Sequence, residues 1–219
     1  MYKLAVIVPF YKSIESNVEQ CFIDEFTEMD DGVLKDIQLI FVDDCSPIPL
    51  NIKIENKKLN FELYRIDSDI EWNVGGAKNL GASVSDAENL LFVDADHSVS
   101  EKTIKFLIDY KLKDNEHMVF VNNRTDSPGT FFTSKKRFLE LNGFDENFSG
   151  YYGYEDINYR KRHEVSGGIF TEYDEEIVVR EKYHHHLLVR NAERNKKIAY
   201  GLVHSGKFIN FKWHRVNLE

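Results

Sequence analysis

The chain has 219 residues, with 28 lysines and arginines against 37 aspartates and glutamates, which gives a formal net charge of −9. This length is enough for one domain with a full hydrophobic core, so a small fold that depends on disulfides is excluded. The acidic balance disfavours broad nucleic-acid binding, and no apolar run approaches the roughly 18 residues of a membrane span.

Three strands are predicted in the first half of the chain, because apolar and β-branched residues run without interruption over residues 4–8, 37–42 and 90–93. Such runs are typical of strands that are buried on both faces of a parallel sheet. Helical patterns separate these runs, and alternating strands and helices indicate βαβ units. We therefore expect an α/β fold with a mostly parallel central sheet flanked by helices.

Three helices are predicted from apolar residues at helical spacing over residues 18–26, 77–84 and 104–108. Ser13 and Ser100 precede the first and third of these patterns. Because a serine side chain accepts hydrogen bonds from the first backbone amides of a helix, we expect both serines to be N-caps.

The second half of the chain has looser patterns. Residues 169–173 and 177–180 predict a short hairpin near the edge of the sheet. Further strands are predicted over residues 117–121 and 130–133, and helices over residues 134–141, 155–163 and 190–200.

The N-terminus reads as a first strand and not as a signal peptide, because its short apolar run ends at Pro9. Cys21 and Cys45 lack C-x-x-C spacing and are expected to be reduced thiols. We therefore expect a cytoplasmic protein. The basic segment 190–212 fits a solvated helix, with a contact to an anionic acceptor or a membrane surface as the alternative. A partner subunit is a candidate source of part of the acceptor site.

Polar side chains follow the three predicted strands of the first half. Tyr11 comes after the first, Asp44 after the second, and Asp94 and Asp96 after the third. In open α/β sheets, ligands bind beyond the carboxyl ends of the strands. Two carboxylates directly after an apolar strand are costly unless they face solvent, a cation or hydrogen-bond donors, and Mg²⁺ and Mn²⁺ prefer such oxygen ligands. Asp44 alone fits an ordinary turn equally well.

Five motifs, taken together and in order, resemble the family 2 glycosyltransferases with the A-type nucleotide-sugar fold. The last of them resembles the acceptor-side segment of β1,4-galactosyltransferases and chondroitin-polymerase-like enzymes, with Tyr152 where tryptophan is usual. The resemblance implies a single domain over residues 1–219, with a Rossmann-like nucleotide-sugar-binding half (1–97) and an acceptor half (98–219). The motifs are VIVPFY at 6–11, FVDDCS at 41–46, NVGGAKNLG at 73–81, FVDAD at 92–96 and NGFDENFSGYYGYED at 142–156.

The resemblance implies a UDP-sugar as the donor. Pro9 and Tyr11 then line the uracil pocket, and Asp44 accepts a hydrogen bond from the uracil N–H. Gly76 allows a close backbone approach, and Lys78 places a cation near the nucleotide or its diphosphate. The alternative for Lys78 is a solvated lysine at an ordinary helix start.

A divalent cation, Mn²⁺ or Mg²⁺, is also implied by the resemblance, with Asp96 as its principal ligand and Asp94 on the ribose or behind the metal. The resembling enzymes complete the site with a downstream histidine. His184 is the first candidate and His186 the second, since alternate residues of an extended segment share a face. The alternative is a solvated polar run.

The catalytic base implied by the resemblance is Asp156, with Glu155 beside it, and both acids open a predicted helix. The expected activity is metal-dependent, inverting transfer of a sugar from a UDP-sugar to a saccharide or glycolipid hydroxyl. Inversion rests on the resemblance alone. The alternatives are a non-catalytic nucleotide- or glycan-binding domain and a nucleotidyltransferase of the same fold, which needs a Gly-rich basic loop that the first strand lacks.

Overall fold

The computed structural model describes residues 1–122, 125–174, 178–179, 189–201 and 206–218. A sheet of eight strands forms its centre, in the order β10-β3-β2-β1-β4-β7-β6-β8. Neighbouring strands are parallel from β3 to β4 and again between β6 and β8, and antiparallel elsewhere. The strands are β1 (Tyr2–Phe10), β2 (Ile37–Asp43), β3 (Phe61–Ile66), β4 (Ala87–Phe92), β6 (Glu116–Asn122), β7 (Thr125–Ser134), β8 (Ile169–Tyr173) and β10 (Trp213–Val216).

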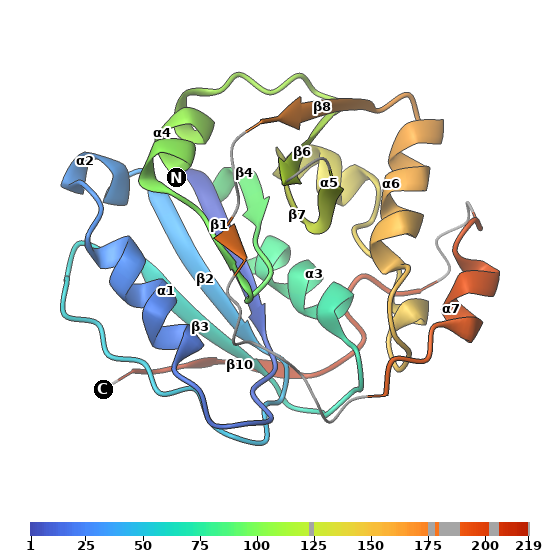
Figure 1. Cartoon of the computed structure of the whole chain (residues 1–219), viewed down its shortest axis with the longest axis horizontal. Coiled ribbons are helices and arrows are strands. Elements are labelled where there is room, and N and C mark those ends of the chain that lie inside the picture. The colour runs from blue at the N-terminus through green and yellow to red at the C-terminus, as the bar shows by residue number, and fades with distance from the viewer. Residues whose placement is uncertain (123–124, 175–177, 180–188, 202–205, 219) are drawn as a thin grey trace.

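Helices cover both faces of this sheet, as Figure 1 shows. Helices α1, α2 and α4 pack on one face, and α3, α5 and α6 pack on the other. A mostly parallel mixed sheet between two helical layers confirms the predicted fold class. The helices are α1 (Val18–Thr27), α2 (Asp31–Leu34), α3 (Val74–Val84), α4 (Glu101–Asp109), α5 (Lys135–Glu140), α6 (Glu155–Val165) and α7 (Glu193–Ile198), with a 3₁₀ turn at Glu146–Phe148.

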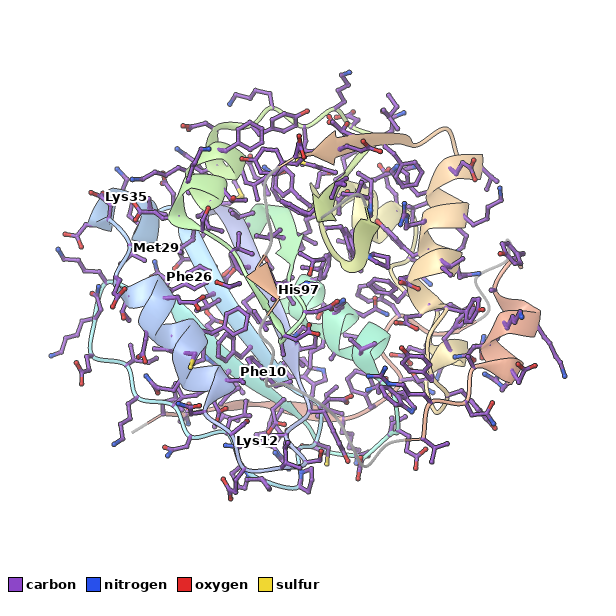
Figure 2. All side chains as sticks on the ribbon, in the orientation of Figure 1. Phe10, Lys12, Phe26, Met29, Lys35 and His97 are labelled. Carbon is purple, nitrogen blue, oxygen red and sulfur yellow. The ribbon has the colours of Figure 1, made fainter. Side chains whose placement is uncertain are left out.

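The core consists of two apolar layers, one on each face of the sheet. Side chains of β1 alternate between them, so that Val6 and Phe10 enter the first layer and Ile7 enters the second. Phe10 meets Phe22 of α1 with ring centroids 5.9 Å apart, and Figure 2 shows Phe10 and Phe26 on this side of the sheet. Burial of both faces explains why the strand sequences are continuously apolar. None of the described helices is both long and apolar enough to cross a bilayer.

The two predicted N-caps have different outcomes. Ser100 is confirmed, because its Oγ accepts a hydrogen bond from the backbone N–H of Thr103. The prediction that Ser13 is an N-cap is wrong, because α1 begins only after Asn17. The buried Ser13 hydroxyl has no hydrogen-bond partner within the described chain. Residues 13–17 instead lead the chain away from β1 before the helix starts.

The predicted hairpin of residues 169–173 and 177–180 is wrong. Strand β8 pairs in parallel with β6, and β9 (Val178–Val179) pairs with β5 (His97–Ser98) in a separate two-stranded sheet. The open edge of β6 offers β8 a longer partner than the two residues of β9. Residues 177 and 180 lie outside the described residues.

Candidate active site

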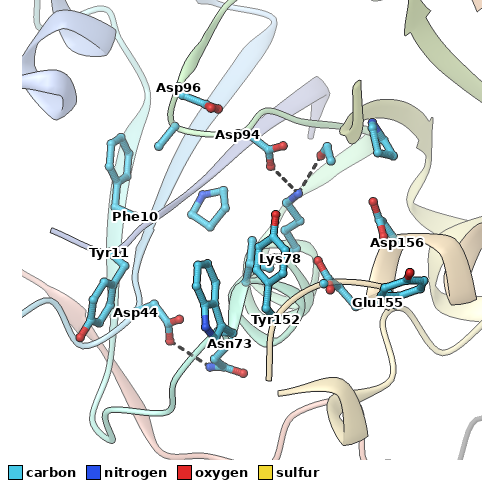
Figure 3. Close-up of a pocket in the computed structure, with 18 of the residues that line it drawn as sticks. Phe10, Tyr11, Asp44, Asn73, Lys78, Asp94, Asp96, Tyr152, Glu155 and Asp156 are labelled. Atoms are coloured by element: carbon cyan, nitrogen blue, oxygen red, sulfur yellow. Dashed lines mark hydrogen bonds and ion pairs between the residues drawn. The ribbon is translucent and has the colours of Figure 1, made fainter. Parts of the chain in front are cut away.

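A cavity of about 620 Å³ lies at the carboxyl ends of β1, β2 and β4, and the loop before α6 closes its other side. Strand ends that are far apart in the sequence meet here because β1 pairs with both β2 and β4 in parallel. Figure 3 shows the side chains that point into it. The predicted site residues that line the cavity are Pro9, Tyr11, Asp44, Lys78, Asp94, Asp96, Glu155 and Asp156.

Sheet register places Tyr11 and Asp44 next to each other. β1 and β2 pair as far as Phe10 and Asp43, and the backbone N–H of Asp44 then donates to the Phe10 carbonyl at 2.8 Å. The two following side chains therefore leave neighbouring strands at the same height. This end of the cavity presents one phenol ring and one carboxylate to a ligand.

Asp44 is a buried carboxyl with a single side-chain donor among the described contacts. Burial raises its pKa to about 7, although Asn73 Nδ2 donates to its Oδ1 at 2.9 Å. Burial also raises the pKa of Tyr11, as does the nearby Asp69. No cation of the described residues compensates the Asp44 carboxylate, so a ligand N–H that donates to it would replace lost hydration.

Lys78 is held by the protein itself. Its side chain is 4% exposed, and its Nζ lies 2.7 Å from both Asp94 Oδ1 and the Gly129 carbonyl. Burial alone raises the pKa of Asp94, but the Lys78 ammonium outweighs it and keeps that pKa below its usual value. Lys78 therefore orients Asp94 and keeps it ionised.

Two glycines bring backbone close to these groups. A Cβ on Gly129 would lie 1.9 Å from Asp94 Oδ2, so only glycine fits between this loop and the carboxylate. A Cβ on Gly76 would lie 2.3 Å from Asn73 Oδ1. Gly76 does not line the cavity, and its close approach is to Asn73 behind Asp44.

Asp94, Asp96 and His97 form a group of possible metal ligands, with one donor atom from each within 4.8 Å of the others. Burial raises the pKa of Asp96. His97 Nδ1 lies 2.6 Å from the Thr130 hydroxyl, which fixes the ring and leaves Nε2 on the side of Asp96, 3.8 Å from its Oδ1. His97 has no role predicted from the sequence, although it directly follows Asp96.

His184 and His186 lie outside the described residues. Described residues on either side of that segment contact residues that line the cavity. Val179 pairs with His97 through β9 and β5, and the Val189 carbonyl accepts a hydrogen bond from Trp72 Nε1 at 3.0 Å. Their assignment as metal ligands stays a prediction.

Glu155 and Asp156 begin α6 and reach the cavity together (Figure 3). Burial raises the pKa of Glu155 to about 7, and the adjacent Asp156 raises it further. Burial also raises the pKa of Asp156, which accepts a hydrogen bond from the Ile157 N–H at 2.7 Å. Near neutral pH one of the two acids holds a proton more readily than an exposed carboxyl does.

Aromatic rings form the rim between the two ends of the cavity. Trp72 and Tyr152 meet edge to face at 4.7 Å, and the Arg190 guanidinium lies 5.4 Å from the Tyr152 ring centre. Trp72 and Tyr154 both have left-handed backbone conformations, with φ of 49° and 72°. Such strain in non-glycine residues clusters at functional sites. Trp72 and Arg190 were not predicted as site residues, because neither belongs to one of the motifs.

Comparison with known proteins places this site in context. The family described as "Glycosyl transferase family 2" matches residues 5–188. S. aureus TarS 1-349 in complex with UDP-GlcNAc is similar in structure, with 17% identity and a TM-score of 0.65 over 90% of this chain and 64% of that chain. A mutant of Drosophila β-1,4-galactosyltransferase 7, in complex with manganese, UDP-Gal and xylobiose, has 13% identity and a TM-score of 0.63.

The extent of these matches differs. The galactosyltransferase match covers 95% of this chain and 83% of that one. The chain spans 59% of another TarS 1-349 structure, at 18% identity and a TM-score of 0.58 over 80% of this chain. No curated protein matches the chain. At these identities the solved structures establish a shared fold.

Proposed function

The chain belongs to glycosyl transferase family 2, and on that premise we propose that it transfers a sugar from a UDP-sugar to a saccharide hydroxyl group with the help of a divalent cation. The observation that carries the proposal is the convergence of three groups on one cavity. These are the Tyr11–Asp44 end, the Asp94–Asp96–His97 group and the Glu155–Asp156 pair. Two neighbours of the same fold are named as complexes with UDP-GlcNAc and UDP-Gal, which supports a UDP-sugar donor.

The donor's uracil ring is proposed to lie at the Tyr11–Asp44 end. Tyr11 supplies a flat surface beside Pro9, and Asp44 accepts a hydrogen bond from the ring N–H. Asn73 holds the Asp44 carboxylate in place, because its side-chain N–H donates a hydrogen bond to Asp44 Oδ1. Lys78 contributes indirectly, because its ammonium is already bound to Asp94 and Gly129.

The possible metal ligands in the cavity suit a divalent cation. Asp96 is the principal ligand, His97 offers a nitrogen on the same side, and Asp94 is kept ionised by Lys78. Carboxylates with one imidazole suit Mn²⁺, and with water they suit Mg²⁺. When bound, the cation neutralises the charge that develops on the departing nucleoside diphosphate. His184 and His186 stay predicted further ligands.

Asp156 is proposed as the base of a single inverting displacement. It accepts the proton of the acceptor hydroxyl while the acceptor oxygen bonds to the anomeric carbon of the sugar. The bond from that carbon to the diphosphate oxygen breaks, and its electron pair leaves with UDP. The helix N-terminus favours the ionised form of Asp156, whereas burial raises its pKa. These two effects act in opposite directions, and burial prevails, so Asp156 is a stronger base than an exposed aspartate.

The acceptor is proposed to be a saccharide, free or lipid-linked, that packs against the aromatic rim of Trp72 and Tyr152. Tyrosine and tryptophan rings give sugar rings a flat apolar surface with a polar edge. The named complex of the galactosyltransferase neighbour with xylobiose supports an acceptor of this class. A cytoplasmic location and a membrane or subunit contact stay predictions.

UDP release from UDP-GlcNAc, UDP-Gal and UDP-glucose in the presence of Mn²⁺, with and without a saccharide panel, tests this proposal. We expect one donor to be turned over and Asp156→Asn to lower kcat at least a hundredfold with UDP affinity retained. Asp114→Asn, on an exposed loop, is the control and keeps its kcat. UDP binding without turnover in every combination would favour the non-catalytic binding domain instead.

A further inference from the structure

The loop that leads into the proposed catalytic acids has left-handed backbone at three positions. Gly150 and Gly153 have φ of 89° and 72°, and Tyr154, directly before Glu155, has φ of 72°. A left-handed residue with a side chain costs about 1–2 kcal/mol. The following helix α6 has no side-chain N-cap to hold its first turn. The conformation of this loop therefore depends on contacts from outside it.

One buried amide supplies three of the contacts that the described residues make with this loop. Asn195 of α7 is fully buried, and its Nδ2 lies 3.0, 3.0 and 2.8 Å from the carbonyl oxygens of Phe148, Tyr151 and Gly153, which share its two N–H groups. Arg194 of the same helix donates to the Asn147 carbonyl. Three carbonyls spread over six residues converge on one side chain, so this side chain sets the path of the loop.

The opposite side of the loop is held by the nucleotide-binding part of the cavity. The Gly150 N–H donates to the Glu71 carbonyl at 2.7 Å, and the Ser149 hydroxyl donates to Asn73 Oδ1 at 2.8 Å. Asn73 is the residue that also donates to Asp44. The loop thus lies between the Asp44 end of the cavity and α7.

We propose that Asn195 is a positioning residue for the catalytic pair, which places Glu155 and Asp156 at the cavity by fixing the loop of residues 148–154 from the side of α7. This inference rests on the proposed function. Asn195 lies beyond the family match, which ends at residue 188. It does not line the cavity, so its loss acts on the base through the loop and removes no direct contact to the nucleotide.

Asn158 offers a matched control. It is a buried asparagine whose Nδ2 also donates to backbone carbonyls, those of Ala199 and Gly201 at 3.1 and 2.8 Å. It thus connects α6 to the far end of α7 without a hydrogen bond to residues 148–153. Asn158→Ala weakens the attachment of α7 and leaves the three loop contacts of Asn195 intact.

The test compares Asn195→Ala, Asn195→Asp and Asn158→Ala below their melting temperatures. For Asn195→Ala we expect the Kd for UDP with Mn²⁺ and the donor KM to stay within twofold and kcat to fall at least tenfold. For Asn195→Asp we expect a larger fall in kcat, because a carboxylate then faces three carbonyl oxygens. Asn158→Ala lowers the Tm by a similar amount and keeps kcat within twofold. An unchanged kcat, an equal loss in both alanine variants, or a tenfold loss of UDP affinity overturns the proposal.

Hydrogen exchange separates this inference from the proposed function. We expect the amides of residues 149–154 to exchange at least tenfold faster in Asn195→Ala than in the native chain or in Asn158→Ala. Unchanged exchange overturns the positioning role even if the chain is a transferase. If no donor is turned over by the native chain, the proposed function fails while the exchange result still decides whether Asn195 fixes the loop.

Discussion

Replacing Lys78 by methionine removes the buried ammonium that holds Asp94. The Lys78 side chain is 4% exposed and that of Asp94 is 31% exposed. Loss of one partner from a buried ion pair costs about 3–5 kcal/mol, because the other charge stays buried without compensation. Since part of Asp94 reaches solvent, we expect a loss of about 3 kcal/mol, the lower end of that range. For a chain of this size the Tm then falls by roughly 6–12 °C.

Urea unfolding of three variants measures this loss. Lys78→Met with Asp94→Asn is expected to recover most of the stability, because the second change removes the unpaired charge. It does not recover Mn²⁺-dependent UDP binding. Lys105→Met removes an exposed partner of Glu101 on α4 and leaves the unfolding free energy unchanged. A Lys78→Met variant as stable as the native chain, or a double variant less stable than the single one, refutes this role for Lys78.

Three further changes have defined outcomes. His117→Phe raises the unfolding free energy by about 1 kcal/mol at pH 8, because neither ring nitrogen has a partner in the described structure. The gain is larger at pH 5, since burial lowers the pKa of His117 well below 6.5 and only the unfolded chain binds that proton; equal gains in urea unfolding at both pH values would contradict this. Gly129→Ala weakens Mn²⁺-dependent UDP binding at least tenfold in calorimetry, because the added Cβ collides with Asp94; native affinity would contradict it. Glu155→Gln moves the acid limb of the kcat profile to lower pH, since it removes the carboxyl that lies beside the base; an unmoved limb would show that the two acids titrate independently.

The sequence was most informative where burial is strongest. The strands at residues 4–8, 37–42 and 90–93 are buried on both faces, so their composition alone indicates their place in the sheet. The polar residues that follow them line one cavity, because parallel pairing brings their carboxyl ends together. This part of the site can therefore be predicted from the sequence once the order of the strands in the sheet is known.

Elements whose partners lie far along the chain were not predicted. Strands β3 and β10 are short and partly exposed, and β10 pairs with β3 across more than a hundred residues. The failed hairpin has the same cause, since strand pairing depends on which edges are open and not on proximity in sequence. The loop contacts of Asn195 are also invisible, because a single asparagine in a polar helix has no distinguishing pattern.

Side-chain partners changed how Lys78 is understood. Its motif suggests a cation near the donor's diphosphate, and spacing alone does not show that Asp94 and Gly129 already occupy its ammonium. His97 illustrates the reverse case, since it follows Asp96 directly and yet only the Thr130 contact shows which ring nitrogen faces the acids. Both depend on the position of β7 beside β4.

Calorimetric titration of UDP into the native chain and into Asp96→Ala, each with and without Mn²⁺, is the most direct test of a metal-dependent UDP-sugar site. We expect Mn²⁺ to strengthen UDP binding to the native chain at least tenfold and to have no effect on Asp96→Ala, while the weaker metal-free binding is the same in both. Metal-independent UDP binding in both proteins, or no UDP binding to the native chain, would contradict the assignment of this cavity.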